Sequence, residues 1–372
     1  MLKEVHISDC QWYWNSKDLL EVIDSNKFVV FVGAGVSMGE PTCLPSFDEL
    51  VEKLELEQEK KYNKEEETCE KYLGKLKYDK INVHKTASEI LSREKLQHNS
   101  LHEYIIDLFK SPKDIKIVTT NYDTMFEQVL AIRGIEGIKI YNSPALPLGN
   151  QFNGIIHVHG NVYDPESMIL TDEDFGKSYI TEGYVSRFLI KTFWSYHVLF
   201  IGYSYEDVIV KYLTRAITTY GSNKRFILIG EESKEFNLLG IQSICFGKNQ
   251  YNILNRIVNH LGKVNHRGLL DWQDVIKEFT LAPPKDVSLE SEIEYCLYDS
   301  NRAFILSKNI HGDNWFYWLE KKGIFDSLFS ISSTLTDNNK VWLDWFVEEF
   351  LGKNDDLIKR CILKYNNQVS TD

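Results

Sequence analysis

Three short motifs in this 372-residue chain carry groups that could do chemistry. A Gly-Ala-Gly turn at residues 33–35 follows an apolar run and can bring backbone N–H groups close to a diphosphate, because glycine has no Cβ in the way. The run T-T-N-Y-D supplies the Asn121 amide and the Asp123 carboxylate, and His159 stands directly before a glycine. An amide can position a nucleophile and an imidazole can accept a proton. Together these motifs predict a catalytic cleft.

Each motif also has a simpler reading. Asp123 fits a helix cap as well as a ribose ligand, and Asn121 fits a turn or cap residue. A fourth motif, Gly202 with Ser204, follows another apolar run and also fits a tight turn. These alternatives stay open when each motif is considered alone, and the combination is more specific than any one of them.

Two common nucleotide chemistries are disfavoured by what surrounds the glycine turn. A dehydrogenase fingerprint needs glycine at position 38, where Met38 stands, and a P-loop needs a G-K-S/T sequence that is absent. The pair His102-Glu103 is followed by Ile106, which breaks the H-E-x-x-H zinc motif. Hydride transfer, ATP hydrolysis and zinc proteolysis therefore lose support.

Composition limits the class of protein further. Acidic residues outnumber basic ones by 54 to 42, which disfavours general nucleic-acid binding. The six cysteines, at positions 10, 43, 69, 245, 296 and 361, have no metal-ligand spacing, so we expect reduced thiols and no metal. No apolar run approaches the about 20 residues that span a bilayer, and no signal-peptide pattern opens the chain. We therefore expect a cytoplasmic protein without a membrane partner.

Alternating apolar strands and helical patterns must position these motifs. They predict an α/β, Rossmann-like fold with a doubly wound, mostly parallel sheet. Because such sheets bind ligands at the carboxyl ends of their strands, the motifs should meet at one edge, with Asn121 exposed at the rim. His157 and His159 are expected to share one strand face. The predicted strands are 28–32, 115–119, 138–141, 154–159, 197–202, 226–229 and 242–246.

Two further regions complete the predicted organisation. Residues 1–262 are predicted to form the α/β domain, with a helical insert at about 46–108 that is either a solvated lobe or a cap over the cleft. Asn99 and Ser100 are candidate caps of a helix within that insert. Residues 263–372 are predicted to form an aromatic-rich, all-helical domain. It is interpreted as a self-contained domain, as the start of a longer helical repeat, or as an oligomer or partner surface.

In their order along residues 22–250, the motifs resemble those of the sirtuin-like NAD-consuming family. The resemblance makes Asn121 and His159 the catalytic pair and His157 a support residue. Protein-deacylating sirtuins carry a four-cysteine zinc module after the catalytic histidine, and no cysteine lies between Gly160 and Phe200 here. By the same resemblance, NAD+ is bound by Gly33, Ala34, Gly35, Ser37, Thr120, Asp123, Gly202 and Ser204.

The T-T-N-Y-D form and the missing zinc module look like the sirtuin-like domains of bacterial antiphage defence proteins. That resemblance implies hydrolysis of NAD+ to nicotinamide and ADP-ribose, NAD+ depletion and abortive infection. It also implies a homo-oligomer and control by a phage-derived activator or a partner defence protein. The chemistry is consistent with the residues, because nicotinamide leaves as a neutral group from a cationic pyridinium and needs no general acid. An amide, a base and a fixed diphosphate suffice, whereas a conventional glycosidase uses a carboxylate pair.

Two other functions fit the same motifs. A NAD-dependent protein deacylase would need an acyl-peptide groove beside the cleft, and the missing zinc module disfavours it. A non-catalytic sensor of NAD or ADP-ribose would use the same loops without chemistry, and the presence of both Asn121 and His159 argues against it.

Overall fold

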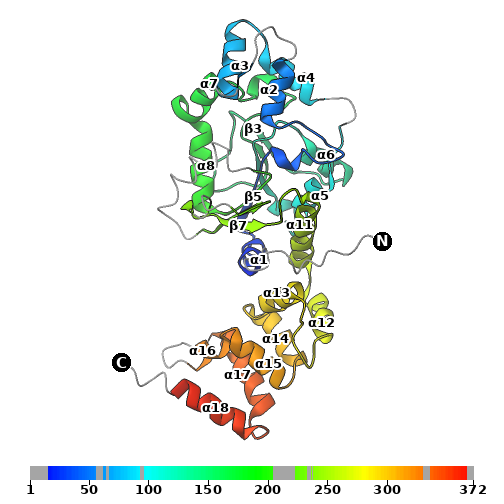
Figure 1. Cartoon of the computed structure of the whole chain (residues 1–372), viewed down its shortest axis with the longest axis vertical. Helices are drawn as coiled ribbons and strands as arrows, with labels where there is room; N and C mark the ends of the chain where they lie inside the picture. The colour runs from blue at the N-terminus through cyan, green and yellow to red at the C-terminus, as the bar shows by residue number, and fades with distance from the viewer. Residues whose placement is uncertain are drawn as a thin grey trace. The chain divides into compact units, whose positions relative to one another are not determined.

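The structure is a computed structural model that describes residues 16–55, 62–63, 67–92, 96–203, 223–232, 236, 238–329 and 336–366. It divides into two compact units, with the division between Asn265 and His266. The first unit contains the β-sheet and the second is built from helices (Figure 1).

A seven-stranded sheet forms the centre of the first unit. Its order is β3-β4-β2-β1-β5-β6-β7, and every pair of neighbours is parallel, which confirms the predicted doubly wound α/β fold. The chain leaves β1 toward β2 on one side and later crosses to β5 on the other, so the topological switch lies at β1. The strands are β1 Phe28–Val32, β2 Lys116–Thr119, β3 Ile140–Asn142, β4 Gly154–His157, β5 His197–Ile201, β6 Arg225–Ile229 and β7 Gln242–Cys245.

The strand register brings the predicted motifs to one edge. Val32 at the end of β1 is level with Thr119 of β2 and Ile201 of β5. The residues that follow these three strands therefore lie side by side at the carboxyl edge. This is the physical basis for one site built from sequence segments that are far apart.

Helices cover both faces of the sheet, as a sheet buried on both sides requires. Figure 1 shows α8 (Tyr184–Ser195) along one face, and α5 (Ser100–Ile106), α6 (Met125–Ile132) and α11 (Tyr251–His266) toward the other. Alternate side chains of β1 point to opposite faces of the sheet. Phe31 packs edge-on against Phe193 of α8, with ring centroids 5.7 Å apart, whereas Phe28 stacks on Phe109 at 4.8 Å. A further helix, α1 (Ser16–Asp24), precedes the first strand.

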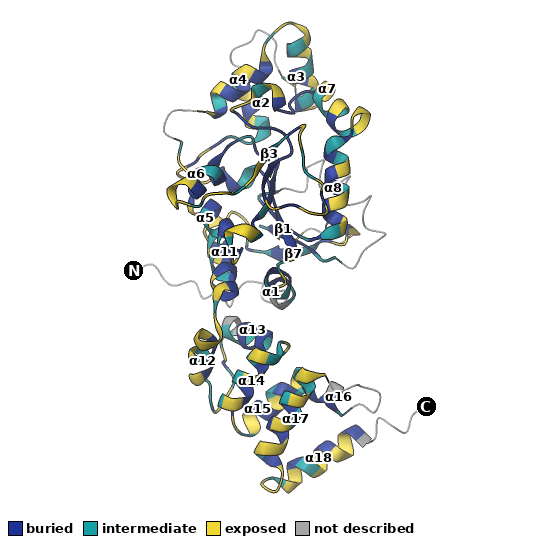
Figure 2. Ribbon diagram, turned by 180° about the vertical axis from the view of Figure 1, so that it is seen from behind, coloured by how far each residue is buried: buried dark blue, intermediate teal, exposed yellow. Residues whose placement is uncertain are grey.

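The helical insert after β1 shares a core with the loop that follows β4. It contains α2 (Phe47–Glu55), α3 (Cys69–Tyr78) and α4 (Val83–Leu91), whose buried side chains pack with Met168 and Leu170. The insert is thus joined to the main domain by a hydrophobic cluster and is not simply a solvated lobe. Figure 2 shows the buried faces of these helices turned toward one another. The predicted cap is confirmed, because the Asn99 side chain accepts the backbone N–H groups of Leu101 and His102 at the start of α5.

The segment after β4 is held to this insert by charged groups. It contains α7 (Asp172–Phe175) and then a π-helix, η6 (Gly176–Thr181). Asp174 accepts hydrogen bonds from His84 at 2.8 Å and from Lys77 at 3.3 Å. Short 3-10 helices complete this unit: η3 Ala34–Val36, η4 Pro112–Asp114 and η5 Pro165–Ser167.

The second unit is an array of short helices joined by tryptophan hydrogen bonds. The indole N–H of Trp315 donates to Phe279 O at 2.8 Å, and that of Trp345 donates to Ile310 O at 2.9 Å. Both indole rings are buried, so each N–H needs such a partner. The helices are α12 Leu269–Lys277, α13 Val287–Cys296, α14 Ser300–Asn309, α15 Asp313–Lys321, α16 Ile324–Leu328, α17 Asp337–Phe350 and α18 Asp355–Asn366. No helix in the described ranges of either unit combines the length and apolar character needed to cross a membrane.

Candidate functional site

The glycine turn after β1 packs directly against the turn after β5. Gly33 N–H donates to Ile201 O at 2.9 Å, and Gly35 N–H donates to Gly202 O at 3.0 Å. A Cβ on Gly33 would lie 2.7 Å from Gly202 O, and Gly202 itself has φ +78°. The glycines therefore allow two turns to touch, and the partly exposed surface of the β1 turn lies at Ala34 and Gly35.

The Ser37 hydroxyl connects three elements at the carboxyl edge. It donates to Asp123 Oδ2 at 2.8 Å and accepts from the Asn121 amide, with 3.2 Å between Nδ2 and Oγ. A third group, His102 Nε2 of α5, lies 3.2 Å from the same oxygen. All four side chains are less than a tenth exposed. The structure thus brings three of the predicted residues together and adds His102, which the sequence analysis had considered only as part of a broken zinc motif.

Asn121 differs from its predicted position in one respect. We expected an exposed amide at the rim, but Asn121 is 8% exposed and its backbone N–H donates to Thr119 Oγ1 at 3.0 Å. The difference arises because the amide turns inward to donate to the buried Ser37 hydroxyl. Asp123 also accepts the backbone N–H of Met125, the first residue of α6, at 3.1 Å, although the N-cap position of that helix is Thr124.

Thr120 lies on the β5 side of this group. Its hydroxyl donates to the hydroxyl of Tyr203 at 2.9 Å, and Tyr203 in turn donates to Val32 O at 2.9 Å. Thr120 is half-buried. This chain of hydrogen bonds ties the ends of β2, β5 and β1. Ser204, the remaining predicted NAD-binding residue, lies outside the described residues.

His157 and His159 do not share a strand, contrary to expectation. β4 ends at His157, and His159 lies in the turn that follows, before Gly160 with φ +76°. The fully buried His157 ring faces two acceptors, Glu127 Oε1 at 2.7 Å and Asn121 O at 3.3 Å. Burial disfavours the charged ring, but the hydrogen bond and charge of Glu127 outweigh it, so the pKa of His157 is raised.

His159 is enclosed by aromatic side chains of the segment after β4. Its Nε2 lies 2.8 Å from the Tyr179 hydroxyl of η6, and its ring packs edge-on against Phe175 at 5.4 Å. Tyr122, next to Asn121, lies 6.4 Å from it by ring centroid. Burial lowers the pKa of His159 to about 3, so the ring is neutral at pH 7. It is 4% exposed in this arrangement.

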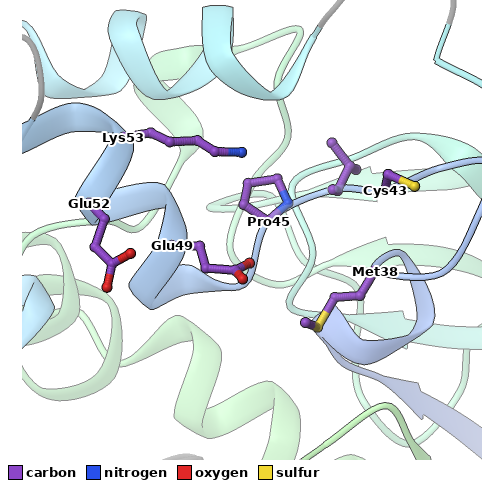
Figure 3. A pocket seen from close by; sticks show the side chains of 7 residues that line it. Met38, Cys43, Pro45, Glu49, Glu52 and Lys53 are labelled. Atoms are coloured by element: carbon purple, nitrogen blue, oxygen red, sulfur yellow. The ribbon is translucent and has the colours of Figure 1, made fainter.

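Two cavities lie in the first unit. One, of about 500 Å³, is lined by Met38 and by Glu49, Glu52 and Lys53 of α2, together with residues 43–45, and by no member of the Ser37 group (Figure 3). The other, of about 490 Å³, is lined by Asp123, Glu127 and Tyr163 together with other residues. Their volumes are within the usual range for small-molecule sites. Within the described part of the chain, no group of three or more His, Cys, Asp or Glu side chains is placed to hold a metal ion.

Residues 115–244, which run from the start of β2 to β7, match a protein-family model described as a SIR2-like domain. The chain contains a SIR2-like domain. The matched range includes Asn121, His159 and Gly202, whereas the Gly33 to Ser37 turn lies before it.

The chain is also similar to individual proteins. An uncharacterised protein of Sinorhizobium fredii, y4cA, is 30% identical over 121 residues, which cover 30% of this chain and 10% of that protein. The match thus spans about a tenth of the length of that relative. A solved structure described as the structural basis for the mechanism and regulation of Sir2 enzymes has a TM-score of 0.40 at 16% identity. That alignment covers 68% of this chain and 98% of the other.

The first unit therefore assembles most of the residues that the sequence singled out, in two neighbouring groups. Ser37, Asn121 and Asp123 form a hydrogen-bonded group, and His159 lies beyond Tyr122. Three contributors were missed: His102, Tyr179, and Glu127 as the partner of His157, which was itself predicted as a support residue. Only His102 left a signal in the sequence, because it stands three residues after the N-cap Asn99, where a capping box places a polar side chain.

Proposed function

We propose that the SIR2-like domain hydrolyses NAD+ to nicotinamide and ADP-ribose. The observation that carries this proposal is the buried group of Ser37, Asn121 and Asp123, with His159 in the next loop along the same sheet edge. An amide held in one orientation can place a water molecule against the nicotinamide ribose. An imidazole nearby can accept a proton from that water or from a ribose hydroxyl.

NAD+ would occupy the carboxyl edge of the sheet. We assign the diphosphate to the partly exposed surface of the turn at Ala34 and Gly35, beside Thr120 and Gly202. The nicotinamide ribose then lies toward Asn121 and His159. Ser204 is proposed as a further NAD contact from the sequence alone.

The deciding experiment compares substrates. Purified full-length protein is incubated with NAD+ with and without an acyl-lysine peptide, while nicotinamide release and peptide deacylation are measured. The proposal expects release without peptide and loss of release in Asn121→Ala. Release only with peptide would support a deacylase. Asn153→Ala is the matched control, because Asn153 donates to Lys113 O at the exposed amino end of β4, away from the site.

Control of this activity is the second part of the proposal. A free NAD+ hydrolase would deplete its own cell, and here His159 is covered by Tyr179 and Phe175. We propose a cytoplasmic enzyme of bacterial antiviral defence that causes abortive infection when a phage-derived activator or a partner protein uncovers the site. The helical unit is proposed to mediate homo-oligomer formation or partner binding. A chain ending at Asn265 should then change in oligomeric state or activity, and no change in either would contradict this role.

A NAD or ADP-ribose sensor remains the second candidate because His159 is so well enclosed. A ring that is 4% exposed and bonded through Nε2 cannot take a proton from substrate without moving Tyr179. Binding of NAD+ measured by calorimetry, with nicotinamide measured in the same sample, separates the two functions. A sensor would bind NAD+ and return it unchanged at every protein concentration.

A further inference from the structure

We propose that His157 is a positioning residue for Asn121, because its Nδ1–H group holds the main-chain carbonyl of Asn121 while Glu127 accepts the proton on Nε2. The inference rests on the proposed function, since Asn121 carries the amide that we expect to act on NAD+. It is more specific than a general supporting role, because it assigns a protonation state to His157 and makes the position of Asn121 depend on that state.

The two hydrogen-bond contacts of the His157 ring determine how many protons the ring carries. Nε2 lies 2.7 Å from Glu127 Oε1, and Nδ1 lies 3.3 Å from the main-chain oxygen of Asn121. A carboxylate and a carbonyl can only accept hydrogen bonds, so each contact needs a proton on the ring nitrogen. A neutral imidazole has one such proton and an imidazolium has two. Both hydrogen bonds are therefore made together only by the charged ring.

The surroundings of His157 favour this charged form. Burial disfavours it, because the ring is 0% exposed, but the hydrogen bond and charge of Glu127 outweigh burial and raise the pKa of His157. The charge of Asp123, in the loop after β2, acts in the same direction. The paired positions on the neighbouring strands hold Thr119 and Asn142, which do not titrate. Among the described residues, Glu127 Oε2 is buried without a hydrogen-bond partner, so this carboxylate is held through Oε1 and His157.

Asn121 is held at three of its four polar atoms. Its backbone N–H donates to Thr119 Oγ1 at 3.0 Å, and its side-chain NH2 group donates to Ser37 Oγ at 3.2 Å. Neither contact reaches the main-chain carbonyl, which sets the plane of the peptide that joins Asn121 to Tyr122. His157 supplies the donor for that carbonyl. The remaining polar atom, Oδ1, is then fixed in position and can accept a hydrogen bond from water or a ribose hydroxyl.

Loss of one ring proton would release this carbonyl. The contact with Glu127 is the shorter one and is made to a charged acceptor, so the remaining proton stays on Nε2. Nδ1 then faces the Asn121 carbonyl with a lone pair, and two acceptors repel each other. Asn121 is 8% exposed, so its carbonyl does not readily find water as a substitute donor. The peptide therefore turns, and the side-chain amide of Asn121 moves with it.

Four full-length proteins test this inference through the pH dependence of nicotinamide release: wild type, Glu127→Gln, His157→Phe and the control Glu103→Gln. Glutamine at position 127 can donate its NH2 group to Nε2 of a neutral ring, which leaves the single ring proton on Nδ1 for Asn121. Phenylalanine at position 157 keeps a ring and removes both donors. Glu103→Gln is the matched control, because Glu103 faces the ring of another histidine, His98, at 3.0 Å.

The predicted pH profiles differ between these proteins. We expect kcat of wild type and Glu103→Gln to fall by about 10-fold or more as the pH rises through the folded pKa of His157, with little change in KM. Glu127→Gln should keep kcat nearly constant over the same pH range, and His157→Phe should have a low kcat at every pH. A fall in kcat of Glu127→Gln like that of wild type, or a wild-type kcat in folded His157→Phe, would overturn the inference.

A second measurement does not depend on catalysis. Long-range ¹H–¹⁵N NMR of wild type should show protons on both ring nitrogens of His157 at pH 6 and loss of the Nδ1 proton as the pH rises. The backbone amide signal of Tyr122, which shares a peptide with the Asn121 carbonyl, should shift with the same midpoint in wild type and stay unmoved in Glu127→Gln. A wild-type Nδ1 that keeps its proton, or an unmoved Tyr122 signal in wild type, contradicts the positioning role even if wild type releases no nicotinamide. Absent release with the expected NMR result would contradict the hydrolase alone.

Discussion

The Tyr179 hydroxyl lies 2.8 Å from His159 Nε2, and this single hydrogen bond blocks the nitrogen that the proposed reaction needs. Tyr179 belongs to a π-helix, η6, a rare form that is frequent at functional sites. Its ring stacks on Phe175 at 5.7 Å, so both side chains cover His159 as one layer. His159 is therefore covered in this structure, and uncovering it requires the side chains of Tyr179 and Phe175 to move.

Removing the Tyr179 hydroxyl should loosen this cover. We expect Tyr179→Phe to lower the free energy of unfolding by about 1 to 2 kcal/mol, because a buried imidazole nitrogen loses its partner. Nicotinamide release should rise, because Nε2 is no longer engaged. Tyr184→Phe is the control, since its hydroxyl bonds Ser178 in the same segment and does not contact His159. Lower release in Tyr179→Phe alone would mean that the hydroxyl takes part in the reaction.

The contact between the two glycine turns gives a stability prediction. Gly202 has φ +78°, and a Cβ there would lie 2.7 Å from Val36 N. Gly202→Ala should therefore lower the free energy of unfolding by about 2 kcal/mol or more, measured by urea denaturation. Gly176→Ala is the matched control, because its φ is −56° and no atom lies within 4 Å of the added Cβ. Equal stability of the two variants would contradict the close packing of the turns.

The Glu127 and His157 pair predicts a dependence of stability on pH. Because Glu127 raises the pKa of His157 in the folded state, the stabilisation is fully present below the unfolded value of 6.5 and is lost as pH rises through the folded pKa. The stability advantage of wild type over Glu127→Gln should thus be larger at pH 6 than at pH 9 in urea denaturation. A stability advantage of wild type that grows with pH would show that Glu127 does not raise the pKa of His157.

His102 predicts the opposite pH dependence. Its pKa is lowered from 6.5 to about 4 by burial, so the unfolded chain binds a proton between these values and the folded chain does not. Wild type should lose on the order of 1.4 kcal/mol of stability per pH unit on acidification through this window because of His102 alone. His102→Phe should lose less between pH 6.5 and pH 4.5. If the free energy of unfolding changed equally with pH in the two proteins, His102 would have to lie in a solvated environment.

The fold was predictable because its signals are local. The run Phe28–Val32 is a continuous apolar strand, and a sheet buried on both faces requires such runs. The start of α5 was predictable because asparagine, here Asn99, is a favoured N-cap residue. The end of β4 was misplaced because Val158 extends the apolar pattern, whereas pairing with β2 and β3 ends at His157.

The site was predictable only in part because its contacts are distant in sequence. Ser37 meets His102 across 65 residues and Asp123 across 86, and no periodic pattern records such pairings. Tyr179 was missed for the same reason, because its contact with His159 joins residues that are 20 positions apart in the sequence. The motif residues indicate the chemistry, whereas the side chains that contact them depend on how the chain packs.

The most direct test of the account is nicotinamide release from NAD+ by wild type, Asn121→Ala and His159→Ala, over a range of protein concentrations and with unfolding curves for each. The account predicts release by wild type, at least at concentrations that allow assembly, and loss of release in both folded variants. Release that persists in folded Asn121→Ala would contradict the role given to the Ser37, Asn121 and Asp123 group. Tight NAD+ binding without release at every concentration would contradict hydrolysis by this chain.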